Sequence, residues 1–353
     1  MSAQTETVKQ RSGLRSRLAH AWKPFRAASP TARVMIFTGV AITLFFVFLA
    51  LFGPALATYD GVQYRVDPGD ISSEQLPRLE APSDEHPMGT TRDRYDVMAR
   101  VIHGARLALA VVVVSTLLAM LIGVPLGLLS GYRGGKLDRF LVTIMDAIYV
   151  FPPLLLAIIV AFLLQAFLDP GVPSAAASVG VVYIPQYFRV VRNHTLSIKQ
   201  EPFVEAARSL GARQSTIVFR YVFFNVVQSV PVIFTLNAAD AVLTLASLGF
   251  LGYGVQPPTP EWGFDISQAT IDITAGAWWT AMWPGLAIVA LVTGLTLVGE
   301  GLNDVINPLL RARGMSGAKL GTAVAPGGED DEDTGEAPKA SEVEGEHIEE
   351  AHT

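Results

Sequence analysis

The chain has 353 residues, of which 50% are hydrophobic and 16% charged, whereas ordinary soluble domains carry about 25% charged residues. It contains no cysteine, which excludes disulfides, thiolate nucleophiles and cysteine-based metal sites. The net charge of −6 is unevenly spread, because residues 329–350 hold eleven acids and one lysine. This composition is typical of a polytopic membrane protein with an acidic tail.

Residues 1–33 form a basic arm with seven Lys/Arg and one glutamate. Leu14, Leu18, Trp22 and Phe25 recur in this arm at helical spacing. Two alternatives fit the pattern: a helix lying on anionic membrane lipid, or a solvated tail that only sets topology. Both alternatives predict that the arm is cytoplasmic, because Lys/Arg-rich segments stay on that side of the membrane.

Six segments are apolar over roughly the 20 residues that a helix needs to cross a bilayer. They lie near 34–57, 105–131, 137–167, 174–191, 222–250 and 281–304. Residues 168–173 and 251–280 carry acids but no Lys/Arg, whereas the turn 131–139 contains three basic residues. By the positive-inside rule, both termini are expected in the cytoplasm. The sequence therefore predicts an all-α membrane bundle of about six transmembrane helices.

The remaining organisation follows from these spans. Residues 34–57 are expected to be the first transmembrane helix, 58–104 an external segment, and 105–310 a core of five helices with a cytoplasmic loop at 192–220. Residues 311–353 lack aromatic side chains and are rich in acids. Such a segment cannot bury enough apolar surface to fold, so it is predicted to be a disordered cytoplasmic tail.

Small residues and prolines mark the second and third spans. Gly123, Gly127 and Gly131 recur every fourth residue and so share one helix face, which lets two helices approach closely in lipid. Pro125 and the pair Pro152–Pro153 predict kinks. Kinked and closely packed helices suit a moving pathway and a static bundle equally, so both interpretations stay open.

Three acids, Asp146, Asp240 and Glu300, fall in or near apolar spans. A carboxylate there costs about 3 kcal/mol unless it faces water or a partner. Asp240 is the main candidate for lining a translocation pathway, and Asn237 and Asp146 are further candidates. The alternative is a neutral or hydrogen-bonded acid at a seam between subunits. Glu300 lies close enough to the end of its span to be solvated.

Sequence motifs of enzymatic chemistry are missing. There is no phosphate-binding Gly-x-x-x-x-Gly-Lys-Ser/Thr loop, and the six histidines are scattered without metal-ligand spacing. No nucleophile motif of the Gly-x-Ser-x-Gly or His-Glu-x-x-His type is present. The chain is therefore expected to be a non-enzyme that holds no cofactor and no metal.

A polar segment, Glu201–Arg220, lies between two long apolar segments. Pro202 suits the first position of a helix and Gly211 the left-handed position that ends one, which predicts a short helix of about nine residues. The range Arg189–Arg220 contains six basic residues and two acids, which predicts that this polar segment is cytoplasmic. A short helix with paired alanines held there suits insertion into a groove of a soluble partner.

The pattern Glu205-Ala206-Ala207-x-x-x-Gly211 resembles the EAA motif of ABC-importer permeases. Over roughly residues 30–312 the chain is similar to the second permease subunit of dipeptide, oligopeptide and nickel importers. The further matching motifs are HPMGT at 86–90, HGARLALAV at 103–111, GYRGGKLDR at 131–139, FPPLLLA at 151–157, RVVRNHTLSIKQEPFVEAARSLGA at 189–212 and SLGFLGYGVQPPTPEWG at 247–263.

The resemblance implies a transmembrane permease subunit of a prokaryotic plasma membrane, forming half of a pathway for di- or oligopeptides. Glu205, Ala206, Ala207 and Gly211 would couple it to ATPase subunits, with the alanines allowing close approach. The implied partners are a homologous permease, two ATPase subunits or domains, an external substrate-binding protein and membrane lipid, but no nucleic acid. ATP and magnesium would be bound by the ATPase partners.

The chain departs from the family pattern at three places. The run Thr91–Asp96 replaces the usual acid followed by Leu-Gly-Arg-Asp, Phe224 replaces a common proline, and Leu245 replaces a frequent glutamate. Nickel or an oligosaccharide therefore remains an alternative substrate. A rival hypothesis is an ion-coupled secondary transporter with Asp240 and Asp146 as coupling sites, and another is a scaffold without transport activity.

Overall fold

The chain divides into two units, Met1–Pro308 and Leu309–Thr353. The computed structural model describes residues 29–57, 77–164, 166–168 and 171–306, all of them in the first unit. The predictions for the amphipathic basic arm and for the acidic tail concern residues that lie outside these ranges.

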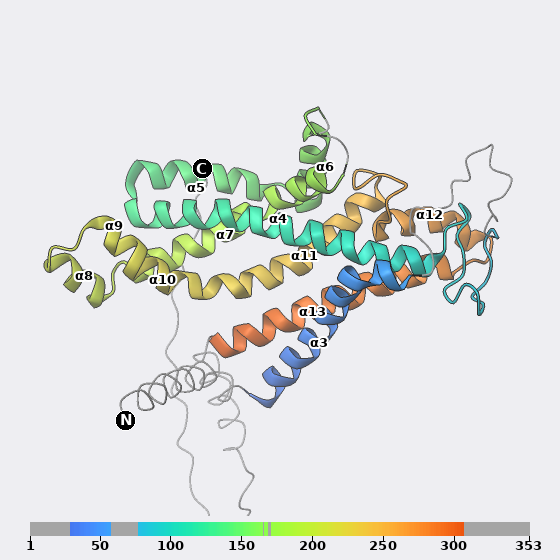
Figure 1. Cartoon of the computed structure of the whole chain (residues 1–353). Helices are drawn as coiled ribbons and strands as arrows, with labels where there is room; N and C mark the ends of the chain where they lie inside the picture. The colour runs from blue at the N-terminus through green and yellow to red at the C-terminus, as the bar shows by residue number, and fades with distance from the viewer. Residues whose placement is uncertain (1–28, 58–76, 165, 169–170, 307–353) are drawn as a thin grey trace, which may run out of the picture. The chain divides into compact units, whose positions relative to one another are not determined.

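Helices account for the secondary structure of the described ranges, where strand-type pairing is limited to an isolated bridge between Thr90 and Asp96. Figure 1 shows the helices in chain order: α3 (Pro30–Leu56), α4 (Val97–Arg133), α5 (Gly135–Val150), α6 (Pro153–Leu164), α7 (Val172–Ile198), α8 (Pro202–Ser209), α9 (Gln214–Thr216), α10 (Phe223–Val226), α11 (Val230–Phe250), α12 (Trp262–Thr274) and α13 (Trp279–Ile306). The prediction of an all-α bundle is confirmed.

Four helical stretches are long and apolar enough to cross a membrane: Pro30–Ala55, Val97–Arg133, Gln214–Phe250 and Trp279–Val305. The pair α5 and α6 makes a fifth span if it is counted as one. The predicted span 174–191 forms α7, which is not among these stretches because its serine, proline, glutamine and arginine residues lower its hydropathy. The bundle is therefore polytopic, and its fourth predicted span is a more polar helix.

The predicted span 137–167 is a broken helix, made of α5 and α6. The helix breaks after Val150 and resumes at Pro153, and the two halves are bent by 100°. Proline disfavours a helical conformation in the residue before it and suits the first turn of a new helix, so Pro152 and Pro153 explain both the end and the restart. The predicted kink at this pair is confirmed, whereas α4 continues as one α-helix through Pro125.

Two spans begin earlier than predicted because a polar side chain caps each of them. The Ser29 hydroxyl accepts a hydrogen bond from the Ala32 amide at 3.1 Å, which starts α3 at Pro30. The Asp96 carboxylate accepts one from the Ala99 amide at 2.7 Å, which starts α4 at Val97. Side chains of this kind satisfy amide groups that the first turn leaves without partners. The last part of the predicted external segment 58–104 is thus helical.

The glycines Gly123, Gly127 and Gly131 lie against α7, as their spacing predicts. A Cβ added at any of them would lie 2.6–2.8 Å from a backbone carbonyl oxygen of α7, which is closer than real Cβ contacts. Those oxygens belong to Ile184, Phe188 and Arg192. We call this contact the glycine seam. Because only glycine permits it, α4 and α7 are held together at backbone distance.

The core lies between α4, α7 and α11 and consists largely of valine, alanine and leucine side chains. Val111 and Val179 are fully buried in it, as is Leu248 on α11. The first and last of the described helices, α3 and α13, pack against each other (Figure 1). The glycine seam and this core together form the frame that carries α8.

Candidate coupling site

The short helix α8 forms where the sequence predicts it. Glu201 precedes the helix in an extended conformation, with φ −69° and ψ 143°, and Pro202 occupies the first position. Proline costs nothing there, because its missing N–H would have no partner within the helix. The helix ends at Ser209, so the predicted boundaries are confirmed.

The end of α8 is a Schellman motif built on Gly211. The Gly211 amide donates to the Arg208 carbonyl at 3.0 Å, and the Ala212 amide donates to the Ala207 carbonyl at 3.1 Å. This pattern requires a left-handed residue at Gly211, and its φ is +78°. The prediction of a positive φ at this glycine is confirmed. The motif fixes the direction in which the chain leaves the helix.

The two sides of α8 are both apolar but differ in exposure. Val204 and Ala207 are buried at 0% and 6% exposure, on the side that packs against the following turn Ile217–Val222. Phe203 and Leu210 are 41% and 88% exposed, and Ala206 is exposed between them. The two predicted coupling alanines therefore do different things. Ala207 packs within the chain, and only Ala206 is open to close approach by a partner.

The exposed positions 203, 206 and 210 follow the spacing i, i+3, i+7. This spacing is typical of a helix that lays its apolar side into a groove of another protein. Glu205 is also exposed on α8, where a carboxylate in the first turn interacts favourably with the helix dipole. The arrangement can bind a partner but offers no catalytic chemistry.

On its N-terminal side α8 is tied to α7, whose end is fixed by charged groups. Arg192 donates from Nε and Nη2 to the two carboxylate oxygens of Asp138 on α5, at 2.6 and 2.7 Å. The Ser130 hydroxyl donates to the same carboxylate at 2.5 Å, and Lys199 Nζ donates to the Gly131 carbonyl at 2.7 Å. We call this group the Asp138–Arg192 clamp. Its bidentate geometry fixes orientation as well as distance.

On its C-terminal side α8 leads into an irregular helical stretch, Gln214–Phe250. Between Gln214 and Phe250 the hydrogen bonding changes from α to π at Ile217–Val222, back to α, then to 3-10 at Val227–Ser229, before α11 begins. Changes of this kind inside a helix are typical of hinges and functional sites. The two chain connections of α8 thus differ in regularity.

The predicted pathway residue Asp146 is exposed on α5 and is paired. Arg189 Nη2 donates to its Oδ1 at 2.9 Å, and the same guanidinium lies 3.9 Å above the ring centre of Tyr149. The pair lies on the same two helices as the Asp138–Arg192 clamp, at their solvent-accessible side.

Asp240 and Asn237 lie three residues apart on α11 and differ in burial. The Asp240 side chain is exposed, whereas Asn237 is buried. The described residues contain no cluster of three or more His, Asp or Glu side chains that could hold a metal ion. The role of Asp146, Asn237 and Asp240 as lining residues stays a prediction.

Sequence reasoning missed the outward side chains of Phe203 and Leu210 and the pairing of Asp138 with Arg192. A leucine directly before a helix-ending glycine is a sequence signal that could have indicated the outward side chain of Leu210. The second has no local signal, because its partners are 54 residues apart and lie on two different helices, α5 and α7.

Comparison with known proteins agrees with this geometry. Residues 123–312 match the family described as the inner membrane component of binding-protein-dependent transport systems. The chain is 35% identical to the glutathione transport system permease protein GsiD of Pectobacterium atrosepticum, over 82% of this chain and 92% of that one. It is 33% identical to the dipeptide transport system permease protein DppC of Alkalihalophilus pseudofirmus, over 78% and 86%.

A solved structure supports the fold alone. The inward-facing MetNI methionine ABC transporter contains a chain that is 22% identical and superposes with a TM-score of 0.50, covering 60% of this chain and 98% of that one. The chain therefore belongs to the family of inner membrane components of binding-protein-dependent transport systems, as a multi-pass transport subunit of the plasma membrane rather than an enzyme.

Proposed function

We propose that this chain forms half of the translocation pathway of an ATP-driven importer for di- or oligopeptides. The observation that carries the proposal is α8, a short helix with an exposed apolar row at Phe203, Ala206 and Leu210. The relatives named for dipeptide and glutathione transport support a peptide substrate.

The proposed complex contains a homologous permease, two ATPase subunits or domains and an external substrate-binding protein. ATP and magnesium would be bound in the ATPase subunits, and this chain would hold no cofactor. Both termini and α8 would face the cytoplasm. The positive-inside distribution of Lys/Arg supports this orientation.

In this proposal the ATPase subunits close on ATP, and their groove moves α8. The exposed apolar row and Glu205 would contact the groove, while Val204 and Ala207 fasten α8 to the rest of the chain. Movement of α8 would then tilt the spans and expose the pathway to the other side. A ligand shifts such an equilibrium only through different affinities for the two states, and here ATP would supply that difference.

A substitution at Leu210 tests the proposal. Leu210→Asp places a charge in the predicted groove and should reduce ATP-dependent uptake of a labelled dipeptide by at least about tenfold, since an apolar anchor is worth about 2 kcal/mol. Leu210→Met keeps an apolar side chain and is the matched control. Uptake is measured in vesicles that contain the complete transporter and the binding protein.

Co-purification of the ATPase subunits should fall with Leu210→Asp and persist with Leu210→Met. Membrane levels should be equal for both variants, because the leucine touches little of its own chain. Wild-type uptake by Leu210→Asp would show that α8 is not the coupling element. Absence of ATP-dependent peptide uptake by the unmodified complex would show that peptides are not the substrate.

A further inference from the structure

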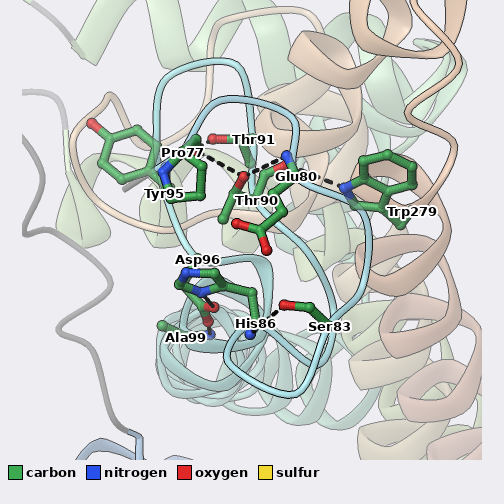
Figure 2. A network of polar contacts seen from close by, with 10 residues as sticks. All are labelled: Pro77, Glu80, Ser83, His86, Thr90, Thr91, Tyr95, Asp96, Ala99 and Trp279. Carbon is green, nitrogen blue, oxygen red and sulfur yellow. Dashed lines mark hydrogen bonds and ion pairs between the residues drawn. The ribbon is translucent and has the colours of Figure 1, made fainter. Parts of the chain in front are cut away.

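Two concave regions of the described chain differ in how far their polar groups are engaged. The larger has a volume of about 640 Å³ and lies between the start of α4 and α12. In the segment before α4, the Thr90 hydroxyl donates to the Pro77 carbonyl at 2.8 Å and accepts from the Glu80 amide at 2.9 Å (Figure 2). On α12, Asp265 and Asp272 are each paired with an arginine. These groups already have partners within the chain, so the smaller region is the one that carries an inference.

The smaller region lies at the break between α5 and α6, and we call it the bend pocket. It is lined by residues 148–153 around the break, by Leu156 on α6, and by Val182 and Gln186 on α7. Figure 1 shows α6 turning away from the line of α5 at this place. The volume of the bend pocket is about 320 Å³, near the lower end of the range of roughly 300–1,000 Å³ that is usual for ligand sites. It therefore has room for part of a peptide.

The bend pocket lies within the membrane-crossing part of the chain. Helices α5 and α6 are long and apolar enough for a span only when they are taken together, and the break falls in the interior of that span. Gln186 lies near the middle of α7, about 20 Å from either end at 1.5 Å per residue. Many transporters bind their substrates at this depth, at sites formed by interrupted helices. The position of the pocket thus suits a substrate site.

The backbone at the break lacks two hydrogen-bond donors. Pro152 and Pro153 have no N–H, so they cannot donate to the carbonyls four residues earlier, as the amides of a continuous helix would. One of these carbonyls, that of Ile148, accepts from the Phe151 amide at 3.3 Å instead. Phe151 itself is 50% exposed, so the chain does not cover its own break. Non-helical backbone at membrane depth is tolerated only where other protein covers it or where it lines a water-filled cavity.

An ion pair beside the bend pocket gives independent evidence about the side that the pocket faces. Arg189 follows Gln186 by one turn on α7, and its Nη2 donates to Asp146 Oδ1 at 2.9 Å. The two charged side chains are 41% and 51% exposed. The Arg189 guanidinium also lies 3.9 Å above the ring centre of Tyr149, which lines the pocket. Charged side chains within a span face water or another protein rather than lipid. The ion pair and the break therefore both indicate that the pocket faces away from lipid.

Gln186 supplies the bend pocket with an amide that has no partner. Its side chain is half-buried, and it makes no hydrogen bond within the described part of the chain. A glutamine amide carries both a donor and an acceptor, the same two groups that a peptide bond presents. The other side chains of the lining are uncharged, and those of Phe151, Leu156 and Val182 are apolar. Apolar walls with few polar groups are usual in ligand sites. This lining complements an amide joined to an apolar side chain.

We propose that the bend pocket is a subsite of the translocation pathway that takes one apolar residue of a passing peptide. Gln186 accepts a hydrogen bond from the N–H of the peptide bond, and Phe151, Leu156 and Val182 contact the side chain of that residue. This inference rests on the proposed function of peptide import, and it adds a place at which the permease itself contacts the peptide. Its basis is the unpartnered amide in an uncharged pocket at an interrupted span.

Photo-cross-linking tests whether a peptide occupies the bend pocket. A dipeptide of photoactivatable leucine and alanine is supplied to vesicles that contain the complete transporter and the binding protein, and the sample is illuminated during ATP hydrolysis. Mass spectrometry should find the label in residues 148–156, and excess dileucine should remove it. Leu156→Trp fills the pocket and should abolish this label. Leu155→Trp is the matched control, because it adds the same bulk at an exposed position of α6 that does not line the pocket, and it should keep the label.

Uptake rates separate a peptide subsite from a purely structural role. Leu156→Trp should slow ATP-driven uptake of dileucine more than that of dialanine, because the smaller side chain needs less room, whereas a structural defect slows both equally. Gln186→Met keeps the length of the side chain and should slow uptake of dialanine about fivefold, the loss of one neutral hydrogen bond. It should not slow uptake of alanyl-lactate, in which an ester oxygen replaces the peptide N–H. Rates are compared per assembled transporter, at equal amounts of loaded binding protein.

Three outcomes overturn the inference. The first is the absence of label in residues 148–156 while the same dipeptide is taken up. The second is equal slowing of dialanine and alanyl-lactate by Gln186→Met. The third is loss of the homologous permease from the Leu156→Trp complex together with no label in the unmodified one, which would assign the pocket to a side chain of that permease. The label in the unmodified transporter and the Gln186→Met result carry the test if Leu156→Trp does not assemble. If ATP-driven dipeptide uptake persists in the unmodified transporter, the inference fails while the proposed function stands.

Discussion

The two connections of α8 differ in how firmly they hold it. Toward α7 the chain meets the glycine seam, where α4 and α7 touch at backbone distance, and the bidentate contact between Asp138 and Arg192. Toward α11 the chain continues into the helical stretch Gln214–Phe250, whose first part changes from α to π and then to 3-10 hydrogen bonding. Because α8 packs against Ile217–Val222, we expect α8 and this π segment to move together with α7.

This difference assigns separate roles to the two connections. Displacement of α8 by a partner would be passed to α7 and α4 as one body, because closely packed helices transmit displacement rather than deform. The 3-10 turn at Val227–Ser229, beyond the segment on which α8 packs, would absorb the change in direction relative to α11.

The glycine seam should show the largest effect. Gly127→Leu would bring a Cβ to 2.6 Å from the Phe188 carbonyl oxygen, so α4 and α7 must separate. We expect a loss of about 3 kcal/mol or more in the free energy of unfolding, seen as a lower unfolding temperature and a lower yield of folded protein. Gly285→Leu is the control, because a Cβ at Gly285 meets no atom within 4 Å. Equal stability of the two variants would contradict the claim that only glycine permits the close contact of α4 with α7.

The clamp should show a smaller loss of stability but a clear effect on coupling. Arg192→Gln removes a bidentate contact whose side chains are 23% and 16% exposed, worth about 1–3 kcal/mol. Arg189→Gln removes the more exposed pair with Asp146, worth less than about 1 kcal/mol.

The measured quantity for the clamp is the number of peptides taken up per ATP hydrolysed. It should fall for Arg192→Gln and stay unchanged for Arg189→Gln. The double variant Asp138→Asn, Arg192→Gln should recover part of the lost stability, because it leaves no unpaired carboxylate. A similar number of peptides taken up per ATP hydrolysed in Arg192→Gln and Arg189→Gln would show that the clamp does not contribute to the rigid connection.

Glu261, before α12, should affect stability as a function of pH but not the coupling of ATP hydrolysis to uptake. Its carboxylate is buried and accepts hydrogen bonds from the Gly263 and Phe264 amides at 3.0 and 2.7 Å. Burial raises its pKa from 4.5 to about 7, against the effect of these amides. The native state therefore holds a proton that the unfolded chain has already lost between these two pH values.

Because the native state binds more protons in that window, the free energy of unfolding should fall as the pH rises from about 4.5 to about 7, by up to roughly 3 kcal/mol. Glu261→Gln should remove this part of the pH dependence, measured from unfolding temperatures at pH 5 and pH 8. The number of peptides taken up per ATP hydrolysed, at fixed pH, should not change, since Glu261 belongs to neither connection of α8. An unchanged pH dependence in Glu261→Gln would refute the raised pKa.

Local sequence signals predicted the local structure well. The spacing of Gly123, Gly127 and Gly131 predicted the seam, and Pro202 and Gly211 predicted both ends of α8 and the positive φ. Each of these depends on backbone sterics that a few neighbouring residues decide.

What the sequence could not predict depends on tertiary contacts. Ala207 faces inward because α8 packs against the turn that follows it, and the pattern Glu-Ala-Ala gives no sign of that side. The contact of Arg192 with Asp138 requires α5 and α7 to be adjacent. The 100° bend between α5 and α6 was predicted as a kink, but its size depends on what each half packs against.

The distance from α8 to each of its connections tests the central claim most directly. Since the chain has no cysteine, spin labels can be attached to introduced cysteines at Ser209, Asn193 and Leu243, all exposed. Distances are measured in the complete transporter without nucleotide and with trapped ATP. We predict that the distance between 209 and 193 stays constant while that between 209 and 243 changes. A change between 209 and 193 as large as that between 209 and 243 would contradict the account.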